Sequence, residues 1–323
     1  MADTIQEQLT KYLADAHSIE EQALQQLRGA PDAVGDPQLA EIFRTHLVET
    51  EEHERLVRAR LEEHDSDPSR LKDLLMRVGG AGFLLFAKAQ PDTSGKLVAH
   101  AFSYEHLELA AYELLRRVAE RAGDAGTAET AQKIRDQEEQ MAKRLEDSFD
   151  RAVDASLREV GRDDLHEQLN KYLADAHAIE AQAIQLLEKG PDLSGDPELG
   201  RLYEEHLEET REHQRLVEQR LDTRGGDTTG LKDTAMRAGA LNWGMFFQMH
   251  PDTSGKLVAF AYAFEHLEIA GYEELKRVAR KVGDEETVAM AESILASERA
   301  AAQKLYGAFD RAVDASLREV GVA

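Results

Sequence analysis

The chain has 323 residues, and its 63 acidic side chains outnumber 39 basic ones, which gives a formal net charge of −24. This excess disfavours DNA, RNA and anionic membranes as partners, because phosphate groups would be repelled. The absence of cysteine excludes disulfides, thiolate metal sites and cysteine nucleophiles. No stretch approaches the roughly 18 apolar residues that span a membrane, and no secretory signal is visible, so we expect a cytoplasmic protein.

The most informative feature of the sequence is that it repeats itself. The segment DRAVDASLREVG at 150–161 returns unchanged at 310–321. A single shift of 160 residues aligns the two halves without a gap, with roughly half of the positions identical. Because a unit of this size can bury its own core, we predict two tandem domains, at 1–161 and 162–323.

In chain order, the apolar spacing of the first repeat predicts helices throughout. The predicted helices span about 4–28, 37–63, 95–121 and 124–158. Asp36 is the expected N-cap of the second helix, with Pro37 in its first turn. About thirty residues, with an apolar amphipathic stretch at 71–89, connect the second helix to the third. This order predicts an all-α fold of two tandem ferritin-like four-helix bundles, each with a long crossover that carries an extra short helix.

Each predicted helix interrupts its apolar stripe near the middle with a carboxylate. The charged residues on the stripes are Glu20, then His46, Glu49 and His53, then Glu105 and Glu108, and finally Glu138. Buried carboxylates are costly unless they protonate or find a partner. Several of them at similar depth would repel one another unless cations lay between them. Carboxylates combined with imidazole favour iron or manganese over a structural zinc ion.

The second repeat carries the same residues on its stripes. The counterparts of the predicted ligands are Glu180, Glu209, His213, Glu265, Glu268 and Glu298. Positions off the stripe change more freely, since Glu54 becomes Gln214 and His64 becomes Arg224. We therefore predict one site per repeat for iron or manganese, dinuclear in each.

In the first repeat we expect Glu49 and Glu108 to bridge the two cations. Glu20, Glu138 and His53 are expected to be terminal ligands, and Glu105 completes the predicted set.

Other polar residues near the stripes are interpreted as structural. His17 and His46 are expected to be hydrogen-bonding groups rather than ligands. His106 lies about 100° from Glu105 around the third helix and is expected to face a neighbouring helix. Tyr112 and its counterpart Tyr272 are interpreted as core tyrosines, with a hydrogen bond to a ligand as the alternative.

Two motifs of each repeat resemble a known family. HLVET at 46–50 and EHLELAAY at 105–112, with a glutamate on the fourth helix, resemble the YciE/YciF-type ferritin-like stress proteins of bacteria. The resemblance covers nearly all of each repeat. It implies a rubrerythrin-like bundle with a dinuclear metal site and a role in stress. Carried over by position, it indicates Glu20, Glu49, Glu105, Glu108 and Glu138 and their counterparts in the second repeat.

The sequence departs from the general ferritin-like pattern of Glu-x-x-His on two helices. Thr50 stands where the glutamate that precedes His53 is expected, and Met141 stands where the fourth helix should carry a histidine. His17 and His106 are candidates to replace the missing ligand. A single-metal site is therefore an alternative to a dinuclear one.

The function that we expect is that of a di-iron or di-manganese carboxylate protein in stress protection, an oxidoreductase of ferroxidase or peroxidase type with O₂ or peroxide as the reactant. The alternative is a stress-induced structural or interaction module whose buried acids bind metal only structurally or not at all. Iron storage in a shell is disfavoured, because a tandem fusion constrains cage symmetry. The crossovers are expected to pack over the bundle, against the sister domain or against another copy in a homo-oligomer.

Overall fold

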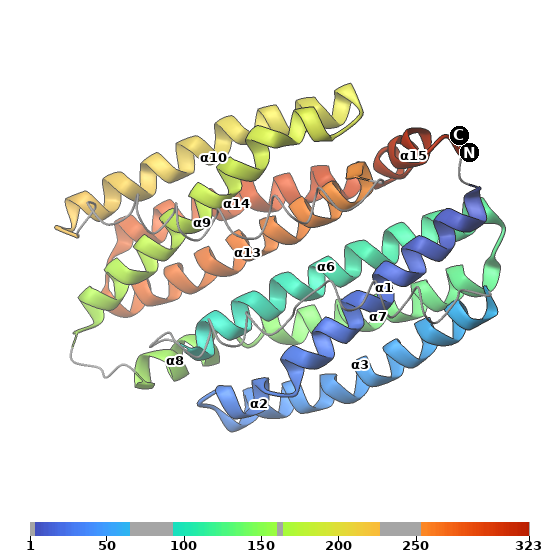
Figure 1. Cartoon of the computed structure of the whole chain (residues 1–323). Coiled ribbons are helices and arrows are strands. Elements are labelled where there is room, and N and C mark those ends of the chain that lie inside the picture. The colour runs from blue at the N-terminus through green and yellow to red at the C-terminus, as the bar shows by residue number, and fades with distance from the viewer. Residues whose placement is uncertain (1–3, 65–92, 160–163, 227–252, 323) are drawn as a thin grey trace. The chain divides into compact units, whose positions relative to one another are not determined.

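The structure is a computed structural model of the chain and describes residues 4–64, 93–159, 164–226 and 253–322. Every regular element within these ranges is a helix, and no strand occurs in them (Figure 1). The predicted all-α class is therefore confirmed for the described residues. The chain divides into two compact units, and the boundary falls between positions 160 and 161.

The helices of the first unit form a closed set of contacts. They are α1 (Ile5–Leu27), α2 (Ala30–Ala33), α3 (Pro37–Glu63), α6 (Thr93–Ala122), α7 (Ala125–Glu146) and α8 (Phe149–Glu159). Helix α1 packs against α3 and α6, and α7 packs against the same two helices from the other side. The long helices therefore surround a common interior, while α2 lies against α3 and α8 lies against α6.

The second unit repeats this arrangement. Its helices are α9 (Leu165–Leu193), α10 (Pro197–Thr223), α13 (Thr253–Val282), α14 (Glu285–Gly307) and α15 (Phe309–Glu319). Helix α9 contacts α10 and α13, and α14 contacts both of these helices as well. Each unit thus presents a face of every long helix to its own interior.

Local side chains set where the helices begin. Thr4 forms a capping box with Glu7 at the start of α1. The Asp36 carboxylate accepts hydrogen bonds from the backbone N–H of Gln38 at 2.9 Å and of Leu39 at 3.2 Å, and Pro37 follows it, as the sequence predicts. These caps satisfy N–H groups that have no partner within the helix.

The fourth predicted helix, at 124–158, is two helices. Helix α7 ends at Glu146, and α8 begins at Phe149. The Ser148 hydroxyl donates to the Arg144 carbonyl at 2.6 Å, so a side chain competes for a helical acceptor at the break. Helix α8 packs against α6 and buries Phe149 and Val153 fully. The predicted crossover helix at 71–89 lies outside the described residues.

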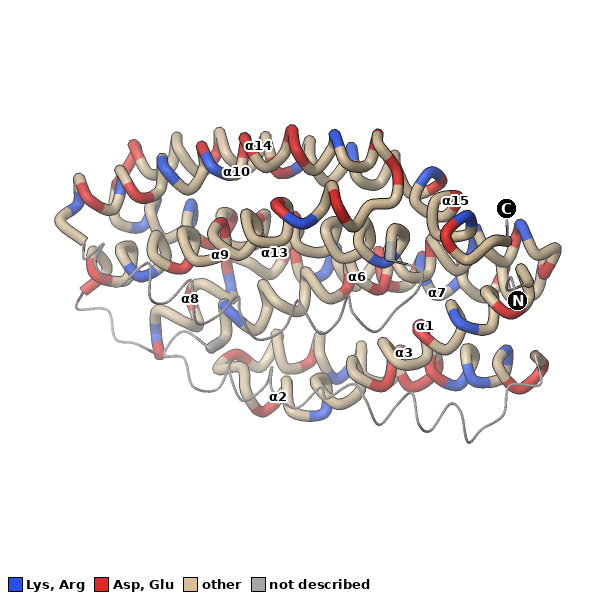
Figure 2. Tube along the Cα trace, turned by 45° about the horizontal axis from the view of Figure 1, so that its top comes forward, with Lys and Arg blue, Asp and Glu red and all other residues tan. Residues whose placement is uncertain are grey.

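Acidic residues occur along all the long helices of both units rather than in one stretch (Figure 2). Their position in the chain therefore does not locate a site. Burial does so instead, because an ionised carboxylate is normally kept in contact with water.

Candidate metal centre

Acidic and histidine side chains gather in the interior of the first unit. His46 of α3, Glu105 and Glu108 of α6 and Glu138 of α7 each offer a ligand atom, and these atoms lie within 4.8 Å of one another. The His46 Nε2 atom lies 3.2 Å from Glu105 Oε2 and 3.6 Å from Glu138 Oε2. All four side chains are buried. We refer to these four residues as the upper group.

A second group shares one residue with the upper group. Glu20 of α1, His53 of α3 and Glu138 place their ligand atoms within 4.8 Å of one another, and we refer to them as the lower group. The His53 Nδ1 atom lies 2.7 Å from Glu138 Oε1 and 3.9 Å from Glu20 Oε1. Glu138 thus presents Oε1 to the lower group and Oε2 to the upper group.

The second unit contains both groups in the same geometry. Its upper group is His206, Glu265, Glu268 and Glu298, and its lower group is Glu180, His213 and Glu298. The Glu298 Oε1 atom lies 2.6 Å from His213 Nδ1, and Glu298 Oε2 lies 3.6 Å from His206 Nε2. One glutamate is therefore shared between the two groups in each repeat.

Helical periodicity explains how so many polar atoms converge. His46 and His53 are seven residues apart on α3, and Glu105 and Glu108 are three apart on α6, so each pair lies on one helix face. The Tyr112 hydroxyl, one turn beyond Glu108, donates a short hydrogen bond to Glu20 Oε1. This bond orients the Glu20 carboxylate toward the interior, and Tyr272 donates to Glu180 in the same way.

Several carboxylate oxygens of the two groups lack a hydrogen-bond donor. Both oxygens of Glu108, both of Glu138 and Oε2 of Glu20 are buried and accept no hydrogen bond of ordinary geometry from the described residues. Buried polar atoms are almost always satisfied, so such a cluster of open lone pairs indicates a missing partner. Oxygen and imidazole donors at this spacing fit a divalent cation.

Burial and mutual repulsion hold protons on several of these acids. Burial raises the pKa of Glu20 to about 8, and the Glu138 charge adds to the effect. Burial also raises the pKa of Glu105 to about 7 and that of Glu108 well above its usual range. The pKa of Glu138 is lowered, because contacts with His53 and His46 outweigh its burial. A cation that enters the interior must therefore displace protons from the other acids.

Glu49, predicted to bridge two cations, is not brought into either group. Its Oε2 atom lies 3.1 Å from His46 Nδ1 and accepts a hydrogen bond of 2.7 Å from Arg144, and its side chain is 27% exposed. The hydrogen bonds from His46 and then Arg144 lower the pKa of Glu49 to about 2. Rotation of about 100° per residue puts position 49 on the flank of the face that carries His46 and His53.

Glu209 lies in the same place in the second unit, 3.1 Å from His206 Nδ1. The other predicted ligands of both repeats belong to the groups described above.

The histidines show which residues the sequence interpretation missed. His46, interpreted as a hydrogen-bonding group, directs Nε2 into the upper group and Nδ1 toward Glu49. Its position on the buried stripe of α3 was the available signal. His17 instead lies 2.8 Å from Glu54, outside both groups. The His106 Nδ1–H donates to the Phe102 carbonyl at 2.7 Å, so His106 is a structural residue of α6.

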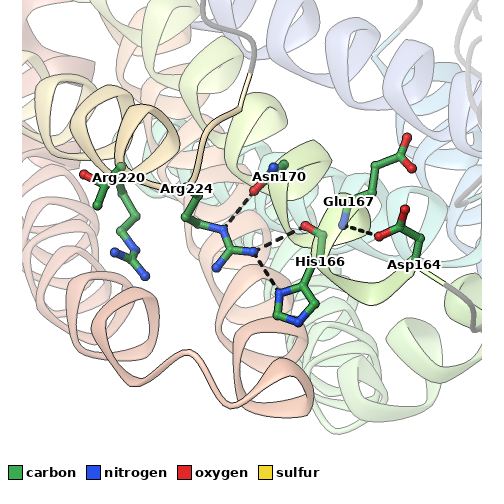
Figure 3. A pocket seen from close by; sticks show the side chains of 7 residues that line it. Asp164, His166, Glu167, Asn170, Arg220 and Arg224 are labelled. Atoms are coloured by element: carbon green, nitrogen blue, oxygen red, sulfur yellow. Dashed lines mark hydrogen bonds between the residues drawn. The ribbon is translucent and has the colours of Figure 1, made fainter.

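A hollow of about 540 Å³ lies at the surface of the second unit, where α9 begins and α10 ends. Arg224 donates to Asn170 Oδ1 at 2.8 Å and to the His166 carbonyl at 3.3 Å (Figure 3). Arg224 and Arg220 also pair with Asp284. Because both guanidinium groups have protein acceptors, we assign the hollow a structural role.

The fold and the clusters define a tandem all-helical protein in which buried His and Glu side chains could hold a metal ion in each repeat. The chain belongs to the family described as "Domain of unknown function (DUF892)", whose model matches residues 4–158 and again 164–318. The two matches correspond to the two repeats. No solved structure was found to match the chain. Among the described residues, no helix has the length and apolar character needed to cross a membrane.

Proposed function

We propose that each repeat is a ferritin-like four-helix bundle that holds a dinuclear iron or manganese centre and uses it in stress protection. The closed order of contacts among α1, α3, α6 and α7 supports this fold. The link between α3 and α6, at 64–92, is long enough to travel the length of a bundle. The resemblance of both repeats to YciE/YciF-type proteins supports the assignment to stress protection.

The shared glutamate is the observation that carries the proposal. A carboxylate that offers one oxygen to each of two neighbouring ligand groups is the arrangement that bridges two cations. Glu138 does this in the first repeat and Glu298 in the second. We therefore propose these two residues as the bridges, whereas the sequence led us to expect Glu49 and Glu108 in the first repeat. His46, Glu105 and Glu108 would hold one cation, and Glu20 and His53 the other.

The residues of the chain determine which molecules can react there. A pair of such cations, when bound, supplies electrons to O₂ or peroxide, or accepts them from Fe²⁺. No ligand of the first repeat is more than 3% exposed, so bulky substrates are excluded. We therefore propose O₂, peroxide and Fe²⁺ as the reactants, in chemistry of the ferroxidase or peroxidase type. Tyr112 keeps Glu20 directed at the lower group, and His46 is held in place by Glu49.

One observation favours the alternative of a structural or interaction module. The raised pKa values of Glu20, Glu105 and Glu108 support it, because protons instead of metal would then keep these acids neutral in the interior. In that case the buried groups would be a proton-linked hydrogen-bond network. The two functions differ in whether the protein carries metal and whether it catalyses a reaction with O₂, peroxide or Fe²⁺.

Metal analysis of protein purified without chelators tests the proposal. We expect about two iron or manganese ions per repeat, absorbance changes when O₂ is added to the ferrous protein, and loss of both in Glu138→Gln paired with Glu298→Gln. His106→Gln paired with His266→Gln is the matched control and should retain metal, because each of these histidines donates to a carbonyl of its own helix and belongs to neither group. A protein that binds no metal, or whose turnover survives in the first double variant, would refute the proposal. Thermal stability unchanged by metal removal, with no turnover, would establish the alternative.

A further inference from the structure

A third group of polar side chains lies on α1 and α3 of the first unit, outside the upper and lower groups. His17 and Glu21 of α1 and Glu54 of α3 place one ligand atom each within 4.8 Å of one another. The His17 Nε2 atom lies 2.8 Å from Glu54 Oε1, and both residues are buried. Glu21 is partly exposed, so this group has a side that is open to solvent. We call these three residues the outer group.

The outer group stands next to the lower group along both helices. Glu20 of the lower group precedes Glu21 on α1, and His53 of the lower group precedes Glu54 on α3. Successive residues of a helix point about 100° apart. The same two helices therefore present one ligand pair to the interior and a second pair to the seam between them.

The second repeat keeps the inner pair and loses the outer one. Glu180 and His213 remain in its lower group, whereas Ala181 and Gln214 stand where the first repeat has Glu21 and Glu54. His177 is retained beside them. The donor set of the outer group therefore exists only in the first repeat, and it depends on two residues that the fold does not require.

The outer group also contains a buried atom without a partner. The His17 side chain is 3% exposed, and its Nδ1 atom makes no hydrogen bond with the described residues. The nitrogen that faces Glu54 is Nε2, so Nε2 is the atom that His17 offers to an ion at the outer group, and the open Nδ1 leaves room for water or another partner on the other side of the ring. Arg58 pairs with the second oxygen of Glu54, but its side chain is 51% exposed, so it can turn into solvent when a stronger cation arrives.

We propose that His17, Glu21 and Glu54 form a separate site for a divalent transition-metal ion in the first repeat. One imidazole and two carboxylates suit Mn²⁺, Fe²⁺ or Zn²⁺. The ion supplies the positive charge that Arg58 otherwise provides to Glu54. Because the second repeat lacks the site, the chain binds one ion more in its first half than in its second.

Anomalous diffraction from crystals soaked in MnCl₂ tests this site separately from the upper and lower groups, which we call together the inner groups. We expect a peak between His17 and Glu54 and none between His177 and Gln214. The variant Glu21→Ala with Glu54→Gln carries the residues of the second repeat, which this fold accommodates. It should lose the outer peak and keep the inner ones, and Mn²⁺ stoichiometry should fall by one ion per chain. Arg58→Gln should strengthen the outer peak, because it removes the competing cation.

The outcomes separate this proposal from the proposed function. Peaks at the inner groups without one at the outer group, or an outer peak that survives the double variant, would overturn the outer site alone. An outer peak without inner peaks would uphold it and overturn the dinuclear centre. The absence of any peak would overturn both.

Discussion

The two repeats differ most where their side chains meet solvent and least in their interiors. The interiors are alike, since the Nε2 atom of His46 lies 3.2 Å from Glu105 Oε2 and the Nε2 atom of His206 lies 2.9 Å from Glu265 Oε2. On the flank, Arg144 donates to Glu49 at 2.7 Å, whereas Lys304 lies 3.8 Å from Glu209. Glu209 is correspondingly the more exposed of the two carboxylates.

This difference separates two kinds of charged residue. The residues of the upper and lower groups are identical in the two repeats. On the flank Glu49 is retained as Glu209, but its basic partner changes from Arg144 to Lys304. Stability alone does not require buried acids, since replacing buried charges with apolar groups is often neutral or stabilising. The comparison therefore favours a chemical reason for the acids in the interior of each repeat.

The largest expected effect comes from removing the shared glutamate of one repeat at a time. Glu138→Gln keeps the shape of the side chain but removes the charge that faces both groups. We expect metal content to fall to about half, with the loss confined to the first repeat, and Glu298→Gln to do the same in the second. Elemental analysis of the two single variants and of their combination measures this. Equal metal content in the wild type and both single variants would contradict it.

The next effect concerns the histidine that the sequence interpretation placed outside the ligand set. His46→Gln removes the imidazole nitrogen from the upper group, and we expect Mn²⁺ affinity in that repeat to fall about tenfold or more. Titration calorimetry, with His206→Gln as the counterpart in the second repeat, measures the change. His106→Gln is the control, because the His106 Nδ1–H donates to the Phe102 carbonyl of the same helix and His106 belongs to neither group. If the affinity changes no more than in the control, His46 is a structural residue and not a metal ligand.

The third effect is a pH dependence that both repeats should share. Metal-free protein is expected to lose stability as the pH rises from about 5 to about 8. The pKa of Glu20 in the native state, about 8, lies above its ordinary value of 4.5, so the native state holds a proton that the unfolded chain releases. Glu105 and Glu265, with pKa values of about 7, act in the same direction. Stability from these groups is full below about pH 4.5 and is lost as pH passes the native pKa.

Thermal unfolding across this range measures the loss, which we expect to be about 5 °C or more. Saturating Mn²⁺ should oppose it, because metal binding displaces the same protons and strengthens as the pH rises. A melting temperature that is flat from pH 5 to pH 8 without metal would contradict the protonation of the interior acids.

The smallest expected effect concerns the basic partner of Glu49, which is an arginine in the first repeat and a lysine in the second. Arg144→Lys gives the first repeat the residue of the second, so Glu49 should become more exposed, as Glu209 is. We expect metal content to stay unchanged and the free energy of unfolding to shift by less than about 1 kcal/mol, because the variant keeps the positive charge of a partly exposed ion pair. Denaturant unfolding and elemental analysis test this. A loss of metal would show that Glu49 contributes to the centre after all.

The sequence located most of the residues of the inner groups, because a helix puts residues three, four and seven apart on one face whatever surrounds it. It placed Glu49 inside and His46 outside the predicted ligand set, whereas the structure brings His46 and not Glu49 into the upper group. His46 lies on the buried stripe of α3 and Glu49 on its flank, and the rotation of that helix decides which of the two faces the interior. That rotation depends on packing against α1 and α7, which no local pattern contains.

The sequence by itself determined the duplication, because its two halves share many identical residues. It also determined the helical class and the presence of acids on the apolar stripes, because apolar residues recur with a period of 3.6 residues. Only the tertiary structure decided that Glu138 is shared between two groups, that His46 and not Glu49 faces the interior, and that His17 meets Glu54. These are contacts between helices. Their geometry depends on how the long helices are rotated and shifted against one another, and packing of the whole core sets it.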